Sequence, residues 1–327
     1  MGFYAGVLRV FQTKEVSVFI IFLGTTLFFF SLQPKFLSQT NVDVLVRITP
    51  ELGIPALGVT MLMIAGEFDI SIGSVFGLAP MMMAIIIETG VNPWLSFLAT
   101  LGICSFIGFT HGIITVKSGI PSFITTLGGL LIWRGVALAV TGGLPKYFYM
   151  PEEFISVTVG KLAPFVYMQE IWFLVIVAIF FIVLEKHRFG NWMRATGSRK
   201  DIARTMGINT NFVKVTCFVL ASLLAGFGGI LQSTRMTTAL PNQGDGLEFD
   251  AIAATVIGGT SLFGGAGTVV GTLVGEYLSR VIENGLIIVR APSYYFRLYI
   301  GIVIIVAVIA NVYLQRRVAR VRSVKVE

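Results

Sequence analysis

Two acidic residues lie where a charge is expensive. Glu67 and Asp69 occur in the run Gly66-Glu-Phe-Asp-Ile-Ser-Ile-Gly-Ser74, between two apolar segments with almost no loop separating them. Carboxylates in such a place must face water, a protein partner or a substrate. Helices that break inside a membrane expose polar groups to cargo, so one interpretation is contact with a polar solute. The other is a tight hairpin whose acids lie in bulk water, and the spacing alone leaves both open.

Arg134 stands in an otherwise uncharged stretch, 125–136. A guanidinium inside a membrane has to find carboxylates, carbonyl oxygens or a wet cavity. It could serve transport, form a structural ion pair or extend to the interface. Glu276, Arg280 and Glu283 differ, because their i,i+4 and i,i+3 spacing predicts that they pair with one another.

The chain shows no motif for catalysis. It lacks G-x-x-x-x-G-K-[ST], H-E-x-x-H and G-x-S-x-G, although Gly258-Gly-Thr-Ser-Leu-Phe-Gly-Gly-Ala-Gly267 has the glycine content of a phosphate loop. Cys104 and Cys217 lie in apolar runs, and His111 has no neighbour at ligand spacing, so no metal site is predicted. We therefore do not expect an enzyme, and His111 is expected to be a packed polar side chain.

These residues must be positioned by an unusually apolar chain. Of 327 residues, 55% are hydrophobic and 13% are charged, and the mean hydropathy is +0.85. A soluble domain carries roughly a quarter charged residues, so this chain could not cover the surface of a soluble protein of its size. The composition excludes a soluble enzyme, a disordered chain and a disulfide scaffold. It also argues against a nucleic-acid partner, despite a net charge of +7.

We expect an all-α polytopic membrane protein with about ten transmembrane helices, each needing about 20 apolar residues. The candidate spans are 16–33, 51–66, 70–88, 93–116, 121–141, 170–185, 213–234, 249–262, 267–289 and 294–314. The second, third and eighth are short or interrupted, which predicts broken or short helices near 64–74 and 249–266. No small-x-small cleavage site follows the first span, so it is expected to be retained rather than removed as a signal peptide.

Basic residues concentrate in two connections. The segment 186–214 carries seven Lys or Arg and the single acid Asp201, and the tail 314–327 carries five basic residues and Glu327. With ten spans, both fall on one side, which the positive-inside rule assigns to the cytoplasm. Both chain termini are therefore expected to be cytoplasmic.

The segment 186–214 is also far longer than a connection needs. Its stretch 198–206 predicts a short helix, with Ser198 as N-cap and Gly207 as the residue that ends it. A surface helix suits docking to another protein, but a plain topology anchor would carry the same charges. The residues alone leave both interpretations open.

A second glycine pattern concerns packing. Gly267, Gly271 and Gly275 recur every four residues. Small residues at this spacing let two helix backbones approach closely, so this row predicts a helix-packing ridge.

Four segments share residues with one family of transport proteins. Gly66-Glu-Phe-Asp-Ile-Ser-Ile-Gly-Ser74 resembles the signature G-G-I-D-L-S-V-G-S. Pro121-Ser-Phe-Ile-Thr-Thr-Leu-Gly128, followed by Trp133-Arg-Gly135, is similar to P-F-I-x-T-L-G and an R-G pair. The chain thus resembles the permeases of bacterial ABC importers of the ribose, xylose and galactoside type.

The other two segments lie in the second half of the chain. Arg194-Ala-Thr-Gly-Ser198 with Ala203-Arg-Thr-Met-Gly-Ile208 is similar to R-A-x-G-x-N followed by A-A-R-x-x-G-I. Gly258–Gly271 resembles G-G-x-S-L-x-G-G-x-G-x-x-x-G. The matches keep the family's order over about 60–275, and the span count agrees over the whole chain.

The resemblance implies a single transmembrane permease domain, 1–327, paired with a second copy or a paralogue around a central path. It implies alternating access powered by a cytoplasmic ABC ATPase subunit, which uses ATP and Mg, while this chain binds no cofactor. An extracytoplasmic solute-binding protein would deliver a sugar or sugar-like cargo. The implied location is the lipid of a bacterial or archaeal cell membrane, with no nucleic acid involved.

The resemblance also implies roles for particular residues, and it makes the 198–206 helix a coupling helix that docks on the ATPase. The implied coupling positions are Arg194, Gly197, Asp201, Ala203, Arg204 and Gly207. The candidates for the translocation path are Glu67, Asp69, Ser71, Ser74, Thr125 and Arg134.

Three positions depart from the family pattern. Glu67 replaces a common Gly, Phe68 a common Ile and Ile202 a common Ala. These differences leave the cargo open among pentoses, hexoses, sugar-like signals and more distant solutes. The alternative function is a stand-alone secondary transporter or channel for a small polar solute.

Overall fold

The computed structural model describes residues 14–292, 294–306 and 309. The N-terminal arm and the basic tail 314–327 lie outside these residues. The helices are α2 Lys14–Leu32, α3 Gln39–Ile64, α4 Ile72–Glu88, α5 Pro93–Ser118, α6 Ser122–Thr141, α7 Glu152–Thr158, α8 Met168–Glu185, α9 Arg188–Ser198, α10 Lys200–Thr205, α11 Thr210–Met236, α12 Leu247–Ile257 and α13 Val269–Ile288.

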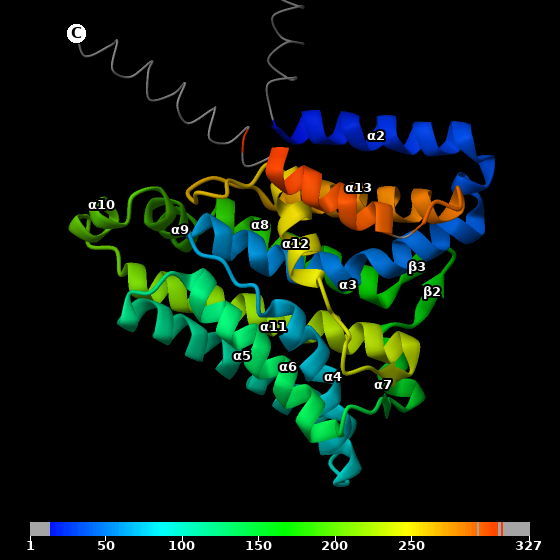
Figure 1. Ribbon diagram of the computed structural model, residues 1–327, viewed down its shortest axis with the longest axis horizontal. Coiled ribbons are helices and arrows are strands. Elements are labelled where there is room, and N and C mark those ends of the chain that lie inside the picture. Colours follow the sequence, from blue (N-terminus) through cyan, green and yellow to red (C-terminus); the bar gives the residue numbers. More distant parts are fainter. Residues whose placement is uncertain (1–13, 293, 307–308, 310–327) are drawn as a thin grey trace, which may run out of the picture.

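Strands are minor additions to this helical bundle. β1 Lys146–Tyr147 pairs with β4 Thr238–Ala239, and β2 Lys161–Ala163 pairs with β3 Val166–Tyr167, both antiparallel. A short 3-10 helix, Pro34–Leu37, precedes α3. In Figure 1, α9 and α10 lie at one end of the bundle, and α7, β2 and β3 lie at the other. The all-α class is confirmed.

The long helices run between these two ends. Among the described residues, five helices are long and apolar enough to cross a membrane by length and composition: α3, α5, α6, α8 and α11. Three shorter helices are also apolar, at Val16–Leu32, Ile72–Glu88 and Tyr294–Val306. Each of the ten expected spans therefore coincides with a helix, the last being described only as far as Val306.

The helices α3 and α11 form the centre of the bundle. Most of both is buried, whereas α5 and α6 expose apolar side chains such as Phe106 and Leu131, the latter 66% exposed. Glycine permits the close approach of α11 to its neighbours, since a Cβ at Gly229 would overlap the carbonyl of Phe76 on α4. An apolar outer surface around a tightly packed centre is what a lipid environment requires.

The second span begins earlier than expected, at Gln39 rather than near 51. The Ser38 hydroxyl caps the helix by accepting a hydrogen bond from Asn41 N. Pro50 and Pro55 lie inside the helix, and Glu51 is paired with Arg235 of α11. The expectation was wrong because Asp43, Arg47 and Pro50 interrupt the apolar run before residue 51. Asp43 pairs with Lys161 and Arg47 lies over the ring of Tyr167, so the helix includes them.

The predicted interruptions occur close to their expected places. α3 ends at Ile64 and α4 begins at Ile72, with Gly66 in a left-handed conformation at φ 84°. α12 has only 11 residues, and an irregular stretch separates it from α13. We call residues 65–71 the first break and residues 258–268 the second break.

The connection 186–214 forms two helices rather than one. Ser198 is the last residue of α9, and Arg199 is the N-cap of α10, so the prediction of Ser198 as N-cap was wrong. The end of α10 was predicted correctly, because Gly207 follows the C-cap Met206 with φ 81°. A left-handed residue directly after a helix is typically glycine.

The glycine row of α13 packs against α12. A Cβ at Gly271 would overlap the carbonyl oxygen of Gly258, and one at Gly275 would overlap that of Ala254. Gly267, in the second break, lies close to the side chains of Thr260 and Ile64. These three positions therefore keep the second break, α12 and α13 in backbone contact.

Candidate functional site

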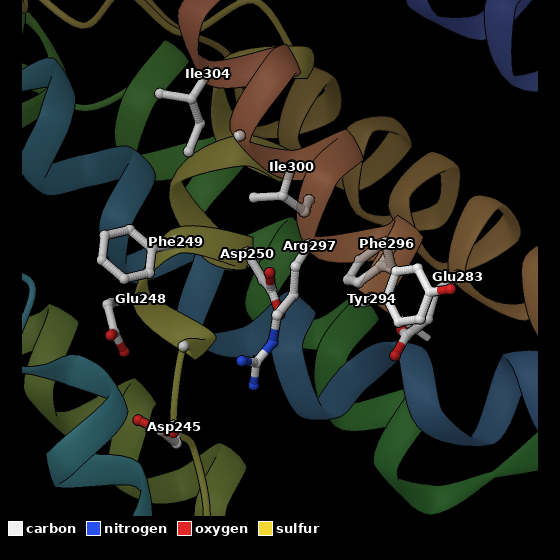
Figure 2. Close-up of a pocket in the computed structure, with 12 residues that line it drawn as sticks. Asp245, Glu248, Phe249, Asp250, Glu283, Tyr294, Phe296, Arg297, Ile300 and Ile304 are labelled. Atoms are coloured by element: carbon white, nitrogen blue, oxygen red, sulfur yellow. The ribbon is translucent and has the colours of Figure 1, made fainter. Parts of the chain in front are cut away.

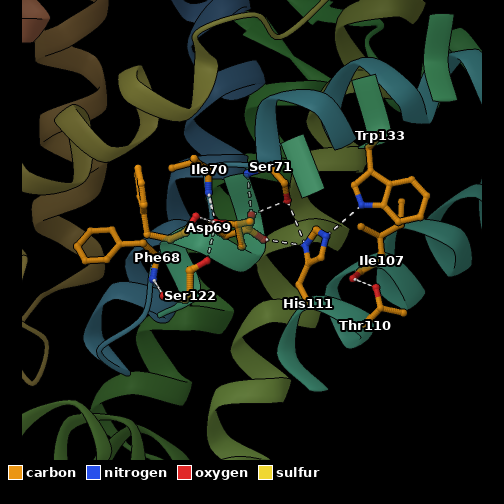
Figure 3. Close-up of polar contacts among 11 residues, drawn as sticks. Phe68, Asp69, Ile70, Ser71, Ile107, Thr110, His111, Ser122 and Trp133 are labelled. Atoms are coloured by element: carbon orange, nitrogen blue, oxygen red, sulfur yellow. Dashed lines mark hydrogen bonds and ion pairs between the residues drawn. The ribbon is translucent and has the colours of Figure 1, made fainter. Parts of the chain in front are cut away.

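A buried polar network holds the first break (Figure 3). Asp69 is 1% exposed, and its Oδ1 accepts hydrogen bonds from the backbone N of Ser71 at 2.8 Å and from its hydroxyl at 2.5 Å. Ser71 Oγ lies 3.2 Å from Nδ1 of His111 on α5. Trp133 on α6 donates from Nε1 to His111 Nε2 at 3.0 Å. One carboxylate thus links the break to two other helices.

The hydrogen bonds of this network are all donated in one direction, from Trp133 toward Asp69. An indole N–H can only donate, so Nε2 of His111 must accept, and the proton of a neutral ring is assigned to Nδ1. Nδ1–H then donates to Ser71 Oγ, and the Ser71 hydroxyl donates to Asp69. Because this hydroxyl is fully buried and gives its proton to a carboxylate, the network fixes backbone geometry rather than presenting a nucleophile.

The backbone of the first break is tied to α6 as well. Phe68 N donates to the hydroxyl of Ser122 at 3.0 Å, and Ile70 N donates to that of Thr126 at 3.2 Å. An irregular backbone segment inside a membrane needs such partners, since its amide groups cannot turn to water. Side chains of α6 therefore accept the hydrogen bonds of two backbone N–H groups of the first break.

The six path candidates lie close to the first break, and all of them except Thr125 form polar contacts with other described residues. Asp69, Ser71, Ser74 and Thr125 are buried. Ser74 Oγ donates to the carbonyl of Leu130 at 2.8 Å. Sequence analysis did not find the partnership of Asp69 with His111. The sequence offers one clue to this partnership, which is a hydrogen-bond donor, Trp133, in the next predicted span.

Glu67 points away from this network. Its carboxylate forms an ion pair with Lys214 in the first turn of α11. Both side chains are nearly buried, at 12% and 9% exposed. The departure from glycine at this position therefore adds a link between the first break and α11.

Arg134 binds carbonyl oxygens, one of the three kinds of partner expected for it. Its Nη1 donates to the carbonyls of Pro241 and Gln243 at 2.9 and 2.8 Å. Its Nη2 reaches the carbonyl of Gly73 at 3.4 Å. Gln243 in turn binds α11, through Ser233 Oγ and the carbonyl of Gly229. Arg134 therefore fixes the irregular segment that precedes α12.

A pocket of about 840 Å³ lies where this segment enters α12 (Figure 2). It is enclosed by the start of α12, by α13 and by the helix Tyr294–Val306. Its charged lining residues are Asp245, Glu248, Asp250, Glu283 and Arg297. Phe249, Tyr294 and Phe296 add aromatic rings. None of the six path candidates lines this pocket.

Three backbone segments meet at the α9–α10 end of the bundle. Gly265 N donates to the carbonyl of Ile64 at 2.9 Å, which joins the second break to the end of α3. A Cβ at Gly197 of α9 would overlap that carbonyl, and one at Gly264 would lie 2.8 Å from the Cα of Gly66. We call Gly66, Gly197, Gly264 and Gly265 the glycine junction. Through it, α9 touches both breaks at once.

The other coupling candidates surround α9 and α10. Arg194 forms an ion pair with Glu185 of α8, and Ala203 is buried. Arg204 donates to the hydroxyl of Thr210 at 2.9 Å and to the side chain of Asn211 at 3.0 Å, which holds α10 against α11. Asp201 lies exposed in the first turn of α10.

The exposed tip of α10 is apolar within a basic surrounding. Ile202 is 48% exposed and Met206 is 73% exposed. Partial burial, together with the charges of Lys214 and Arg204, holds the pKa of Lys200 below its ordinary value. Exposed apolar side chains beside positive charges are typical of a protein interface.

Comparisons with known proteins consistently find permease components of transport systems. A family model described as branched-chain amino acid transport system / permease component matches residues 41–308. The ribose import permease protein of Escherichia coli K12 is 33% identical over 86% of this chain and 88% of its own length. The xylose/arabinose import permease protein of Sulfolobus acidocaldarius is 31% identical over 97% of this chain and 90% of its own length.

The name of a third relative gives a different kind of cargo. The autoinducer 2 import system permease protein of Salmonella typhi is 30% identical over 90% of this chain and 84% of its own length. No solved structure matches the chain.

Proposed function

The chain belongs to the branched-chain amino acid transport system / permease component family, and from this we propose that it carries a sugar or sugar-like polar solute into the cell by alternating access. It is a multi-pass membrane protein and a permease component of an ABC import system, a transport subunit rather than an enzyme. The two sugar permeases and the autoinducer permease among its relatives support the class of cargo.

The glycine junction is the observation that supports coupling to an ATPase. A partner that docks on α9 and α10 would press on Gly197, and Gly197 contacts the end of α3 and the second break. Backbone-to-backbone contacts transmit a rigid-body shift because no flexible side chain lies between them. We infer that Arg194, Gly197, Asp201, Ala203, Arg204 and Gly207 belong to the element that couples ATP hydrolysis to transport.

The docking surface is the tip of α10. Ile202 and Met206 would enter an apolar groove of the ATPase, and the surrounding basic residues would meet acidic ones. The ATPase would bind ATP and Mg, and this chain would bind no cofactor. This end of the bundle would then face the cytoplasm, which agrees with the density of Lys and Arg in 186–214.

At the opposite end, α7 and the strand pairs would receive a solute-binding protein. A second copy or a paralogue would complete the central path, in the cell membrane of a bacterium or archaeon. The six path candidates would act by holding the wall of this path. They shape the first break through Asp69 and Ser71, tie it to α11 through Glu67, and support α12 through Arg134.

Reconstitution distinguishes this proposal from a stand-alone transporter. The chain is placed in liposomes alone, or together with its ATPase and solute-binding protein, and uptake of labelled ribose, xylose and arabinose is measured. We expect ATP-dependent uptake only in the complete system, and no response to Na⁺ or proton gradients with the chain alone. Ion-driven uptake by the chain alone would contradict the proposal.

A further inference from the structure

The charged side chains of the pocket beside α12 form few direct contacts, although Arg134 acts on Asp245 and Glu248, and Arg280 and Arg297 act on Asp250, through space. Among the residues that the structure describes, the carboxylates of Asp245, Glu248 and Asp250 form no hydrogen bond or ion pair with another residue. The guanidinium of Arg297 forms none either. Glu283, by contrast, pairs with Arg280 of its own helix. Figure 2 shows Asp245, Glu248 and the guanidinium of Arg297 toward one part of the pocket, and Tyr294, Phe296 and Glu283 toward another.

Glu248 is the clearest of these groups. It is only 4% exposed, yet its side chain forms no hydrogen bond or ion pair with another described residue. Its carboxylate lies beside Gly73 of α4, where a Cβ would overlap it. Its own backbone N–H and the charge of Arg134 offset only part of the cost of burying this carboxylate. A ligand that enters the pocket and donates hydrogen bonds would remove this cost.

We propose that this pocket holds the solute during transport, by hydrogen bonds from solute hydroxyl groups to Glu248, Asp245 and Asp250. The proposal rests on the proposed function and adds to it the residues that contact the cargo.

The lining fits a neutral polyhydroxylated solute. Carboxylates accept hydrogen bonds from hydroxyl groups, and Arg297 can donate to a hydroxyl or ring oxygen. Phe249, Tyr294 and Phe296 offer apolar faces for the C–H side of a sugar ring. An anionic solute would be repelled, because the carboxylates outnumber the single guanidinium of the lining. The volume of about 840 Å³ exceeds that of a single sugar and leaves room for water.

The position of the pocket connects it to the parts that would move. α12 begins inside the bundle, and solute sites in transporters commonly lie where a helix is discontinuous. Glu248 touches the first turn of α4, directly after the first break. A solute that binds Glu248 would therefore lie beside the helix that follows the first break, and the glycine junction holds the start of that break at Gly66.

Cysteine labelling tests whether water and solute reach the pocket. Gly301 lines the pocket and has open space around its Cα, so Gly301→Cys adds a thiol without overlap. Leu131→Cys on the outer face of α6 is the control. The native Cys104 and Cys217 are buried and give little background. In the assembled complex, we expect a charged methanethiosulfonate reagent to modify Gly301→Cys and not Leu131→Cys, and the transported sugar to slow the reaction.

Glu248→Gln tests the role of the carboxylate. A charge-assisted hydrogen bond is about twice as strong as a neutral one, and its weakening is expected to lower uptake at limiting solute by about tenfold. Glu170→Gln is the matched control, because Glu170 is another nearly buried acid, bonded to Tyr277 and remote from the pocket lining. Glu170→Gln should keep the uptake of the wild type. Equal recovery of the ATPase with both purified variants checks that both complexes assemble.

The outcomes separate the two proposals. If the wild-type system imports none of the three sugars, the proposed function fails. If it imports sugar and Glu248→Gln does so equally well, the pocket proposal fails while the function stands. A Gly301→Cys thiol that is as unreactive as Leu131→Cys also overturns the pocket proposal.

Discussion

Asp69 shows how one buried acid can organise a break in a membrane helix. Its Oδ1 accepts two hydrogen bonds from Ser71, and its Oδ2 lies 3.8 Å from Nδ1 of His111. Oδ1 thus accepts both hydrogen bonds of the carboxylate, Oδ2 lies near His111 without a hydrogen bond, and the indole of Trp133 sets the tautomer of His111. The function of this acid is to fix the backbone between α3 and α4.

Replacement of this acid should destabilise the protein. In Asp69→Asn the two hydrogen bonds from Ser71 lose their charge assistance, and the new amide NH2 is buried in the place of Oδ2, beside His111. We expect a loss of about 1–3 kcal/mol in unfolding free energy, measured as a lower Tm in detergent. Glu153→Gln, an exposed acid of α7, is the control and should leave the Tm unchanged. An equal Tm for Asp69→Asn would show that the network does not hold the break.

Single residues were only partly predictable from the sequence. The need of Arg134 for buried partners followed from its place in an apolar stretch, but the partners themselves lie 107 and 109 residues away. The same holds for His111, whose contacts come from the first break and from α6. Spacing along the chain predicts contacts within one helix, such as Glu276 with Arg280, because only those are fixed by helical periodicity.

At the scale of elements, the glycine junction joins α9 to both breaks. Each of these glycines lies against another backbone, so a methyl group has no space there. The contact is therefore rigid, and it depends on four positions only.

A methyl group at Gly197 should disturb the contact of α9 with α3 and the second break, and so uncouple ATP hydrolysis from transport. Gly197→Ala places a Cβ on the carbonyl of Ile64 and near Gly265 N, which displaces α9. Overpacking of this kind costs about 1–3 kcal/mol, so uptake by the complete system should fall by about tenfold while ATP hydrolysis continues. Uptake per hydrolysed ATP is the measurement.

The control for this substitution is Gly102→Ala on α5, where nothing lies within 4 Å of the added Cβ. It should keep the uptake per ATP of the wild type. An unchanged ratio in Gly197→Ala would contradict transmission through the junction.

The elements themselves were largely predictable, with two instructive exceptions. Apolar runs located the helices, because a lipid-facing helix needs an uninterrupted apolar surface. α3 was predicted to begin too late, since Asp43, Arg47 and Pro50 resemble a loop, whereas Lys161 and Tyr167 supply partners for the two charges. α9 was missed because its polar sequence, with two arginines, carries no apolar run.

For the whole molecule, the structure separates a tightly packed centre from an apolar exterior. α3 and α11 are mostly buried, and the helices around them turn Leu, Ile and Phe side chains outward. Buried and partly buried charges occur at defined places, such as the pairs Glu51 with Arg235 and Glu67 with Lys214 and the carboxylates of the pocket. The pocket could not be predicted from the sequence, because its walls come from α12, α13 and Tyr294–Val306, whose mutual packing no local pattern determines.

The pairing of α3 with α11 has a consequence for biogenesis. The partners of Glu67 and Glu51 follow 147 and 184 residues later in the chain. At a synthesis rate of about 5–20 residues per second, α3 waits roughly 7–40 s before α11 is made. During that interval, the carboxylates of Glu51 and Glu67 lack their basic partners. The newly made segment that holds them should therefore need an insertase to shield it. A chain that ends at residue 209 should accordingly be degraded in pulse-chase experiments, whereas a chain that ends at residue 246, after α11, should persist longer.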